Sequence, residues 1–289
     1  MKLGVVFPQT EIGPAPEGVR RYAEAIESAG FEHLVIYDHV LGASPNRAGW
    51  SGPYTIEHQF HEVMVLFGFL AACTTRLELV TEILVLPQRQ TALVAKQAAE
   101  IDLLSGGRLR LGVGLGWNAV EYEALGQNFH ERGKRIEEQI VLLRRLWSEP
   151  EVTFSGAYDH VSAAGLNPLP NRQIPIWMGT SAEAGLRRAA RVADGWQSEL
   201  GLGPKLEENL RSLRGYLRDV GRDEGSFGIA GEVGFGPDGV IGAIRDVRAW
   251  AALGATHVSL TTMDVGLTGP DAHIARLVEF KRAWEAAGA

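Results

Sequence analysis

The segment from residue 81 to residue 122 constrains the fold most, because it contains a strand, a helix, a second strand and a turn in unbroken order. Residues 83–86 are continuously apolar and end at a proline, which is typical of a parallel strand buried on both faces. Residues 91–104 carry apolar side chains at helical spacing and are followed by a glycine pair, as helix ends favour. The apolar run 109–113 then leads into the glycine-rich turn 114–118, where the backbone can approach a bound group closely.

The same alternation continues along the whole chain and predicts the fold class. Strand patterns lie at residues 3–7, 33–37, 77–86, 109–113, 175–179, 195–199, 229–235 and 257–262. Helical patterns lie between and after them, at residues 16–29, 63–74, 91–104, 132–147, 182–193, 206–220, 240–253 and 271–286. Eight such units predict an α/β fold of the (β/α)8 TIM-barrel type as a single domain, 1–289, with insertions near 42–61 and 148–172. A doubly wound open sheet is the alternative if the strands at 195–199 and 229–235 do not form.

Composition narrows the class of protein. The net charge is −7, and the basic residues are dispersed among acidic ones, which argues against a nucleic-acid partner. A single cysteine excludes an intrachain disulfide and a cysteine-rich metal site. No apolar run approaches the ~18 residues of a membrane span and no signal sequence opens the chain, so we expect a cytoplasmic protein without a membrane segment.

Function in such a barrel is expected at the carboxyl ends of the strands. Asp38-His39 follows the second predicted strand, Thr81-Glu82 lies within the third, and the turn 114–118 follows the fourth. Gly179-Thr180-Ser181 follows the fifth strand, and Glu199 ends the sixth. These groups should therefore meet at one mouth of the barrel.

Two of these groups suggest chemistry. His39 is suited to moving a proton near neutral pH, and Asp38 or a backbone carbonyl could fix its tautomer, although the pair could also be a polar strand terminus. The turn Gly179-Thr180-Ser181 precedes a helix that begins near Ala182, so its free amides and hydroxyls could hold a phosphate. The alternative interpretation is that Ser181 only caps that helix.

A metal site is not expected. His58 and His61 are spaced so that both could face one ion from a helix, but the sequence shows no third ligand nearby.

Four strings resemble one known family. They are YDHV at 37–40, the block from 81 to 126, FHERGKRIEEQIVLLRRLW at 129–147 and IPIWMGTSAEAGLRRAARVADGW at 174–196. They are similar to the bacterial luciferase-like superfamily, and most similar to its deazaflavin-dependent oxidoreductases, which use coenzyme F420. The resemblance spans nearly the whole chain. It implies a TIM-type barrel with a flavin-like ring across the strand ends. It also implies a homodimer, and the helices at 63–74 and 91–104 are apolar enough to bury a second face in it.

The resemblance also implies roles for individual residues. It makes His39 the imidazole beside the reactive carbon of the ring, with Asp38 as its neighbour. It implies a non-proline cis peptide at Thr81-Glu82, whose bulge supports the ring, and a phosphate site at Gly179, Thr180 and Ser181. The flank of the cofactor would be lined by Gly114, Gly116, Trp117 and Asn118.

Two departures from the family bear on cofactor and substrate. Related FMN enzymes have a phosphate-binding arginine where this chain has Leu115, and leucine cannot replace a bidentate guanidinium. The sugar-phosphate dehydrogenases of the deazaflavin branch have an acidic proton donor where this chain has Trp117. The sequence therefore favours F420 over FMN and argues against a sugar-phosphate substrate.

The expected function is hydride transfer between F420 and an organic small-molecule substrate, with His39 as general acid or base. One alternative is an FMN-dependent monooxygenase in which Arg89, Arg132 or Arg135 reaches the phosphate. A second is a non-catalytic flavin-binding protein. The two insertions are expected to determine which substrate is accepted.

Overall fold

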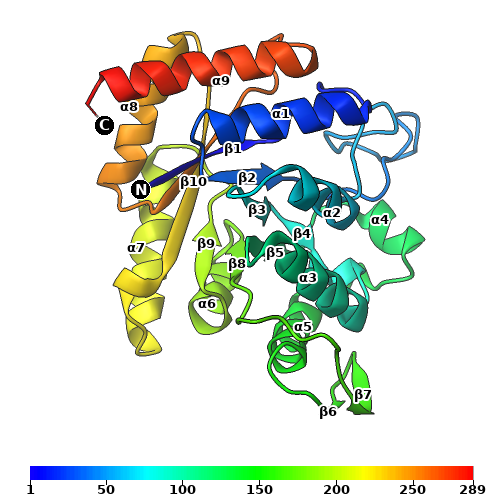
Figure 1. Ribbon diagram of the computed structural model, residues 1–289. Coiled ribbons are helices and arrows are strands. Elements are labelled where there is room, and N and C mark those ends of the chain that lie inside the picture. Colours follow the sequence, from blue (N-terminus) through cyan, green and yellow to red (C-terminus); the bar gives the residue numbers. More distant parts are fainter. Residues whose placement is uncertain (289) are drawn as a thin grey trace.

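The computed structural model describes residues 1–288, which form the closed (β/α)8 barrel that the alternation predicts (Figure 1). The barrel strands are β1 (Lys2–Val6), β2 (His33–Ile36), β3 (Glu78–Thr81), β5 (Leu109–Gly114), β8 (Ile176–Gly179), β9 (Gly195–Gln197), β10 (Gly228–Gly234) and β11 (His257–Thr261). Neighbouring strands are parallel, and β1 pairs with both β2 and β11, which closes the sheet. The doubly wound alternative is therefore excluded, and both of the less certain strands are formed.

Helices surround the barrel, and all eight predicted helices are present close to their expected bounds (Figure 1). They are α1 (Pro16–Ser28), α2 (Val63–Cys73), α3 (Thr91–Ser105), α5 (Arg132–Leu146), α6 (Glu183–Val192), α7 (Pro204–Asp219), α8 (Gly239–Ala252) and α9 (Gly269–Ala286). The short helix α4 (Ala119–Ala124) was not predicted. Of the helices in residues 1–288, none combines the length and the apolar character that crossing a bilayer requires.

The strand expected at 77–86 is interrupted, so that prediction is wrong in its middle. β3 ends at Thr81 and the chain resumes as β4 (Leu84–Val85). Between the pairs Val80↔Arg110 and Leu84↔Val113 this strand advances four residues while β5 advances three, so one extra residue forms a bulge. The cis peptide bond lies inside this bulge, between Glu82 and Ile83, one residue later than the family resemblance implies.

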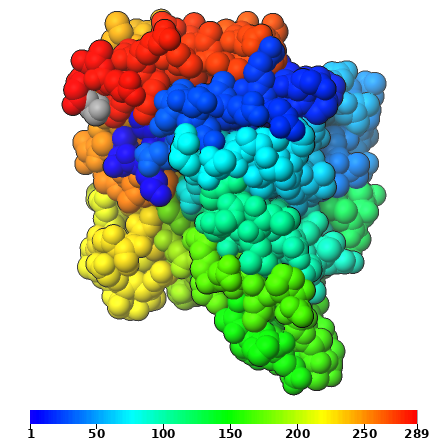
Figure 2. Space-filling view, viewed as in Figure 1, coloured from blue at the N-terminus to red at the C-terminus, as the bar shows by residue number. Residues whose placement is uncertain are grey.

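The insertion at 148–172 forms an antiparallel hairpin of β6 (Val152–Ser155) and β7 (His160–Ala164). The hairpin projects from the barrel beyond α5, and Figure 2 shows this part of the chain as a protrusion. Its turn is held by Glu138 of α5, whose carboxylate accepts hydrogen bonds from three consecutive backbone N–H groups, those of residues 157–159. The hairpin is thus fixed to the outside of the barrel.

A layer of buried aromatic and titratable side chains closes the amino-terminal end of the barrel. His257 packs against Trp177 with ring centroids 4.9 Å apart and against His33 at 5.4 Å. The Arg110 guanidinium lies 4.2 Å from the Trp177 ring centroid and is paired with Glu78 at 3.1 Å. Burial, together with the charge of Arg110, lowers the pKa of His257 to about 3 and lowers that of His33 as well.

Because the pKa of His257 is depressed in the folded state, the unfolded chain binds more protons below about pH 6.5. The stability that neutral His257 contributes is present above that pH and is lost as the pH falls towards 3. Replacing His257 by Asn should therefore flatten the dependence of the free energy of unfolding on pH between 6.5 and 5, by about 1 kcal/mol per pH unit. Urea unfolding at several pH values measures this slope.

The matched control is His160→Asn, since His160 is exposed on β7. That variant should keep the slope of the parent protein. An unchanged slope in His257→Asn would contradict the assignment.

Candidate active site

A cavity of about 630 Å³ opens at the carboxyl ends of the barrel strands. Its walls come from the ends of β2 and β10, the bulge after β3, and the loops that follow β5, β8 and β9. Segments far apart in the sequence therefore converge on one space, as the strand-end analysis expects.

Most of the predicted site residues line this cavity. They are Asp38, His39, Glu82, Gly116, Trp117, Asn118, Gly179, Thr180 and Ser181. Thr81 and Gly114 are not among the lining residues of the described chain. The Thr81 side chain is fully buried and donates its hydroxyl hydrogen to the carbonyl oxygen of Gly112 at 2.6 Å, so it points away from the cavity.

Gly114 has a different use. A Cβ built on it would lie 2.7 Å from the side chain of Ile83, and a Cβ on Gly179 would also collide with Ile83. The two glycines thus make room for the residue that the bulge pushes out, and Ile83 itself lines the cavity. The bulge and the two glycine positions depend on one another.

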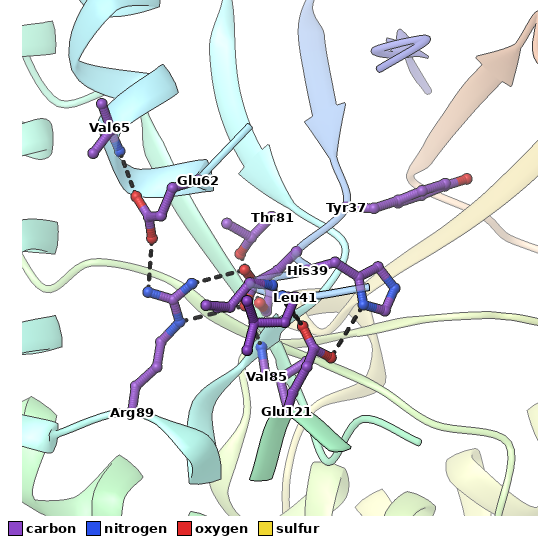
Figure 3. Close-up of polar contacts among 12 residues, drawn as sticks. Tyr37, His39, Leu41, Glu62, Val65, Thr81, Val85, Arg89 and Glu121 are labelled. Atoms are coloured by element: carbon purple, nitrogen blue, oxygen red, sulfur yellow. Dashed lines mark hydrogen bonds and ion pairs between the residues drawn. The ribbon is translucent and has the colours of Figure 1, made fainter. Parts of the chain in front are cut away.

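His39 is held by a residue that the sequence analysis missed (Figure 3). Its Nδ1 lies 3.2 Å from Oε2 of Glu121, whose residue is 1% exposed. The other carboxylate oxygen of Glu121 accepts the backbone N–H groups of Val40 and Leu41. A carboxylate fixed by two amides orients the ring and favours hydrogen on Nδ1, which leaves Nε2 to face the cavity.

Asp38 does not fix the tautomer of His39, so that interpretation is wrong. Its carboxylate is buried, accepts the backbone N–H of Val85 at 3.0 Å, and pairs with the Arg89 guanidinium at 2.7 Å. Arg89 also binds Glu62 at 2.7 Å, and Glu62 caps the first turn of α2 (Figure 3). Burial raises the pKa of Asp38, and the charge of Arg89 counteracts this only in part.

Aromatic side chains surround the His39 imidazole. The ring centroids of Phe60, Tyr54 and Trp117 lie 4.7, 5.1 and 5.5 Å from that of His39. Tyr54 and Phe60 belong to the insertion at 42–61, so this insertion covers the histidine. The insertion at 148–172 supplies no lining residue within the part of the chain that the structure describes, so the expectation that it determines substrate choice gains no support.

The turn before α6 is not a simple helix cap. The N-cap residue of α6 is Ala182, whose side chain makes no capping hydrogen bond, and the Thr180 hydroxyl accepts the Ala182 N–H at 3.3 Å. Trp196 and Asn209 hold the turn by donating to the carbonyl oxygens of Thr180 and Ser181, at 2.7 and 2.9 Å. The interpretation of Ser181 as the cap is therefore wrong, and the positive end of α6 faces the cavity.

Acidic side chains form another part of the cavity wall. Glu82, Glu199 and Glu232 all line the cavity, and the Tyr37 hydroxyl donates to Glu232 at 2.7 Å. Burial raises the pKa of Glu82 to about 8, and the negative charges of Glu232 and Glu199 contribute. Burial also raises the pKa of Glu232, which the Tyr37 hydrogen bond partly offsets.

Glu121 could have been found from the sequence. Asn118 and Glu121 have the spacing of a helix N-cap and its third residue, and Asn118 does cap α4 by accepting the N–H of Val120. Glu121, however, bonds to the loop after β2 rather than back to its own helix. Glu232 could not be found from the sequence, because it lies inside a predicted strand. The end of that strand had to be known before Glu232 could be placed at the mouth of the barrel.

Comparison with known proteins identifies the family. The family model described as luciferase-like monooxygenase matches residues 1–237. The chain belongs to the luciferase-like monooxygenase family. Because this family and the relatives described below are oxidoreductases, the chain is an oxidoreductase.

Several members of the luciferase-like family are similar to it. An uncharacterised protein of Mycobacterium tuberculosis is 36% identical over 208 residues, which cover 69% of this chain and 71% of that protein. An F420-dependent glucose-6-phosphate dehydrogenase of Kineococcus radiotolerans is 30% identical over 84% of this chain and 71% of its own. An FMNH2-dependent dimethylsulfone monooxygenase of Pseudomonas fluorescens is 34% identical over 61% and 46%. The solved structure of an F420-dependent secondary alcohol dehydrogenase shares the fold, with a TM-score of 0.80, 17% identity and 98% of each chain covered.

The Asp38–Arg89 pair yields a stability prediction. Replacing Arg89 by Met leaves a buried carboxylate without its partner, which should lower the free energy of unfolding by about 3 kcal/mol. The double variant Asp38→Asn with Arg89→Met should recover part of that loss. Chemical denaturation of the single and double variants measures the coupling.

Lys205→Met provides the control, since Lys205 and Glu208 form an exposed pair. Its unfolding midpoint should not change. If Arg89→Met is as stable as the parent protein, Asp38 is not anchored as described.

Proposed function

We propose that this member of the luciferase-like family is a coenzyme F420-dependent oxidoreductase that transfers a hydride between the deazaflavin and an organic small molecule. The observation that carries the proposal is the joining of three parts in one cavity. These are the open amino terminus of α6, the bulge at Glu82–Ile83, and the His39–Glu121 pair. The cavity can thus bind a phosphate and a planar ring beside a side chain that transfers protons.

F420 is favoured over FMN by what the cavity lacks. No arginine or lysine of residues 1–288 lines it, and Leu115 occupies the turn after β5. The arginines that the FMN alternative requires are used elsewhere. Arg89 binds Asp38 and Glu62, Arg132 lies over the Phe129 ring at 3.7 Å, and Arg135 donates to a backbone carbonyl. The similarity to an F420-dependent glucose-6-phosphate dehydrogenase supports the same choice.

The residues present fit such a cofactor. The amides and hydroxyls of Gly179, Thr180 and Ser181 would hold its phosphate at the end of α6, and Ile83 on the bulge would support the ring. Gly116, with a φ of 63°, and Trp117 would lie along its flank. When bound, the deazaflavin supplies the hydride chemistry.

His39 moves the proton that accompanies the redox step. Glu121 accepts from Nδ1 and stabilises the positive charge of the ring when Nε2 takes a proton from the substrate. In the opposite direction Nε2 returns that proton to the substrate oxygen or nitrogen that is bonded to the carbon receiving the hydride. Phe60, Tyr54 and Trp117 shield the imidazole from bulk water and keep this transfer local.

The competing function is an FMN-dependent monooxygenase. The similarity to an FMNH2-dependent dimethylsulfone monooxygenase favours it, over a shorter part of this chain. It requires reduced flavin and consumption of oxygen. A non-catalytic flavin-binding role would give cofactor binding without turnover, and the His39–Glu121 pair would then have no purpose.

We also propose a homodimer. Val65 of α2 and Leu93 and Leu104 of α3 are 72%, 52% and 73% exposed, and the two helices pack side by side (Figure 1). Light scattering should give about twice the chain mass of 31.4 kDa. Val65→Glu combined with Leu104→Glu should give monomers, whereas Ile241→Glu, at an exposed position of α8, should not. A monomeric parent protein would refute this.

The hydride-transfer proposal is tested by an anaerobic screen of oxidised and reduced F420 against alcohols, amines and carbonyl compounds, followed by the absorbance of the deazaflavin. On the substrate found, His39→Ala should lower turnover by about 100-fold or more, the usual contribution of a general acid or base. Glu121→Gln should lower turnover by about tenfold, because the ring loses its ionic partner. The dissociation constant of F420 should change little in either variant.

His130→Ala serves as the control, since His130 is exposed and does not line the cavity. Equal turnover in His39→Ala and the parent protein would remove His39 from the mechanism.

A further inference from the structure

Three carboxylates face the cavity without a basic partner. Glu82 comes from the bulge, Glu199 from the loop after β9, and Glu232 from β10. No lysine or arginine of the described residues forms an ion pair with any of them. Arg110 exerts an electrostatic effect on Glu82, but its guanidinium is bonded to Glu78 and stacked on Trp177.

The negative charges of these three carboxylates repel one another. Burial and the neighbouring carboxylates raise the pKa of Glu82 to about 8, which favours its protonated form. Glu232 keeps a hydrogen bond from the Tyr37 hydroxyl and is the better acceptor of the two. A cation placed between the carboxylates would let Glu82 ionise and would relieve the repulsion.

A metal ion is not that cation. Within residues 1–288 no three His, Cys, Asp or Glu side chains are close enough together to hold one. The cation that fits these carboxylates is therefore an organic one.

A second, independent observation points to a ligand in the same cavity. Gln88 lines it and is 2% exposed, yet neither its Oε1 nor its Nε2 has a hydrogen-bond partner in the described chain. A buried amide without partners is costly unless a bound molecule supplies them. The cavity thus presents unfilled acceptors and donors together with unpaired negative charge.

We propose that Glu82, Glu199 and Glu232 form a subsite for a positively charged nitrogen of the substrate, so that the substrate of this oxidoreductase is an amine or another basic nitrogen compound. The proposal deepens the function proposed above and rests on it for the redox step alone. The ammonium group donates hydrogen bonds to the carboxylates, Glu82 releases its proton to solvent, and the Gln88 amide binds a polar group of the same ligand. A phosphate ester would be repelled by this wall, which sets the substrate apart from that named for the glucose-6-phosphate dehydrogenase relative.

The test is calorimetric titration of the protein, without added cofactor, at pH 7 with three matched probes. These are 2-phenylethylamine, which is a cation at this pH, 3-phenylpropionate, an anion, and 3-phenylpropionamide, which is neutral. The amine should bind about tenfold tighter than either of the others, a difference of about 1.4 kcal/mol. Titrations in buffers with different ionisation enthalpies should show release of protons on binding.

Variants assign the effect to the three carboxylates. Glu232→Gln and Glu199→Gln should each weaken amine binding by about tenfold, and Glu82→Gln should abolish the proton release. Glu208→Gln, an exposed position on α7, is the control and should bind as the parent protein does. Thermal melts establish that each variant is folded.

Equal affinity for the three probes, no binding of the amine, or unchanged amine binding in folded Glu232→Gln would overturn the proposal. Because the titration uses no cofactor, its failure leaves the F420 assignment standing. Failure of F420 binding would likewise leave the amine result intact.

Discussion

The buried carboxylate of Asp38 is the constraint on which the site depends. It joins the end of β2 to the strand after the bulge through the N–H of Val85, and it joins both to Arg89, which precedes α3. Arg89 extends the connection to Glu62 and the first turn of α2. The bulge and the histidine that follows Asp38 are therefore held by one buried ion pair. Because its carboxylate is buried and bonded to Val85 and Arg89, we infer that Asp38 holds the site in position.

The cavity that results has two electrostatically different features. One is the positive terminus of α6, where backbone amides are open to an anion. The other is a set of carboxylates that lack basic partners among residues 1–288. His39 lines the same cavity, fixed by Glu121 and covered by aromatic rings. The cavity can thus offer one site to an anionic cofactor tail and another to a cationic substrate.

The fold could be predicted from the sequence because its signals are local. Buried parallel strands appear in the sequence as apolar runs, and outer helices appear as periodic apolar patterns. The structure contains the strands and helices that these patterns predict. The bulge at Glu82–Ile83 could not be located, because a one-residue insertion in a strand leaves no periodic trace. The cis bond was placed one residue too early because its position came from the family resemblance.

The hydrogen-bond and ion-pair partners of the site residues were harder to predict from the sequence. Asp38 and His39 are adjacent in sequence, but neighbouring side chains at a strand end point in different directions, so one meets Arg89 and the other Glu121. Glu121 is 82 residues from His39 along the chain. Pairs of this kind are created by closure of the barrel, which no local pattern records.

The most direct test of the account is a paired titration of the purified protein with oxidised F420 and with FMN, followed by fluorescence. We predict micromolar binding of F420 and binding of FMN that is weaker by about tenfold or more, since no basic side chain of the described cavity wall can hold the FMN phosphate. Tighter binding of FMN would favour the oxygen-using monooxygenase. Binding of neither compound would contradict the assignment of the cavity as a flavin-type site.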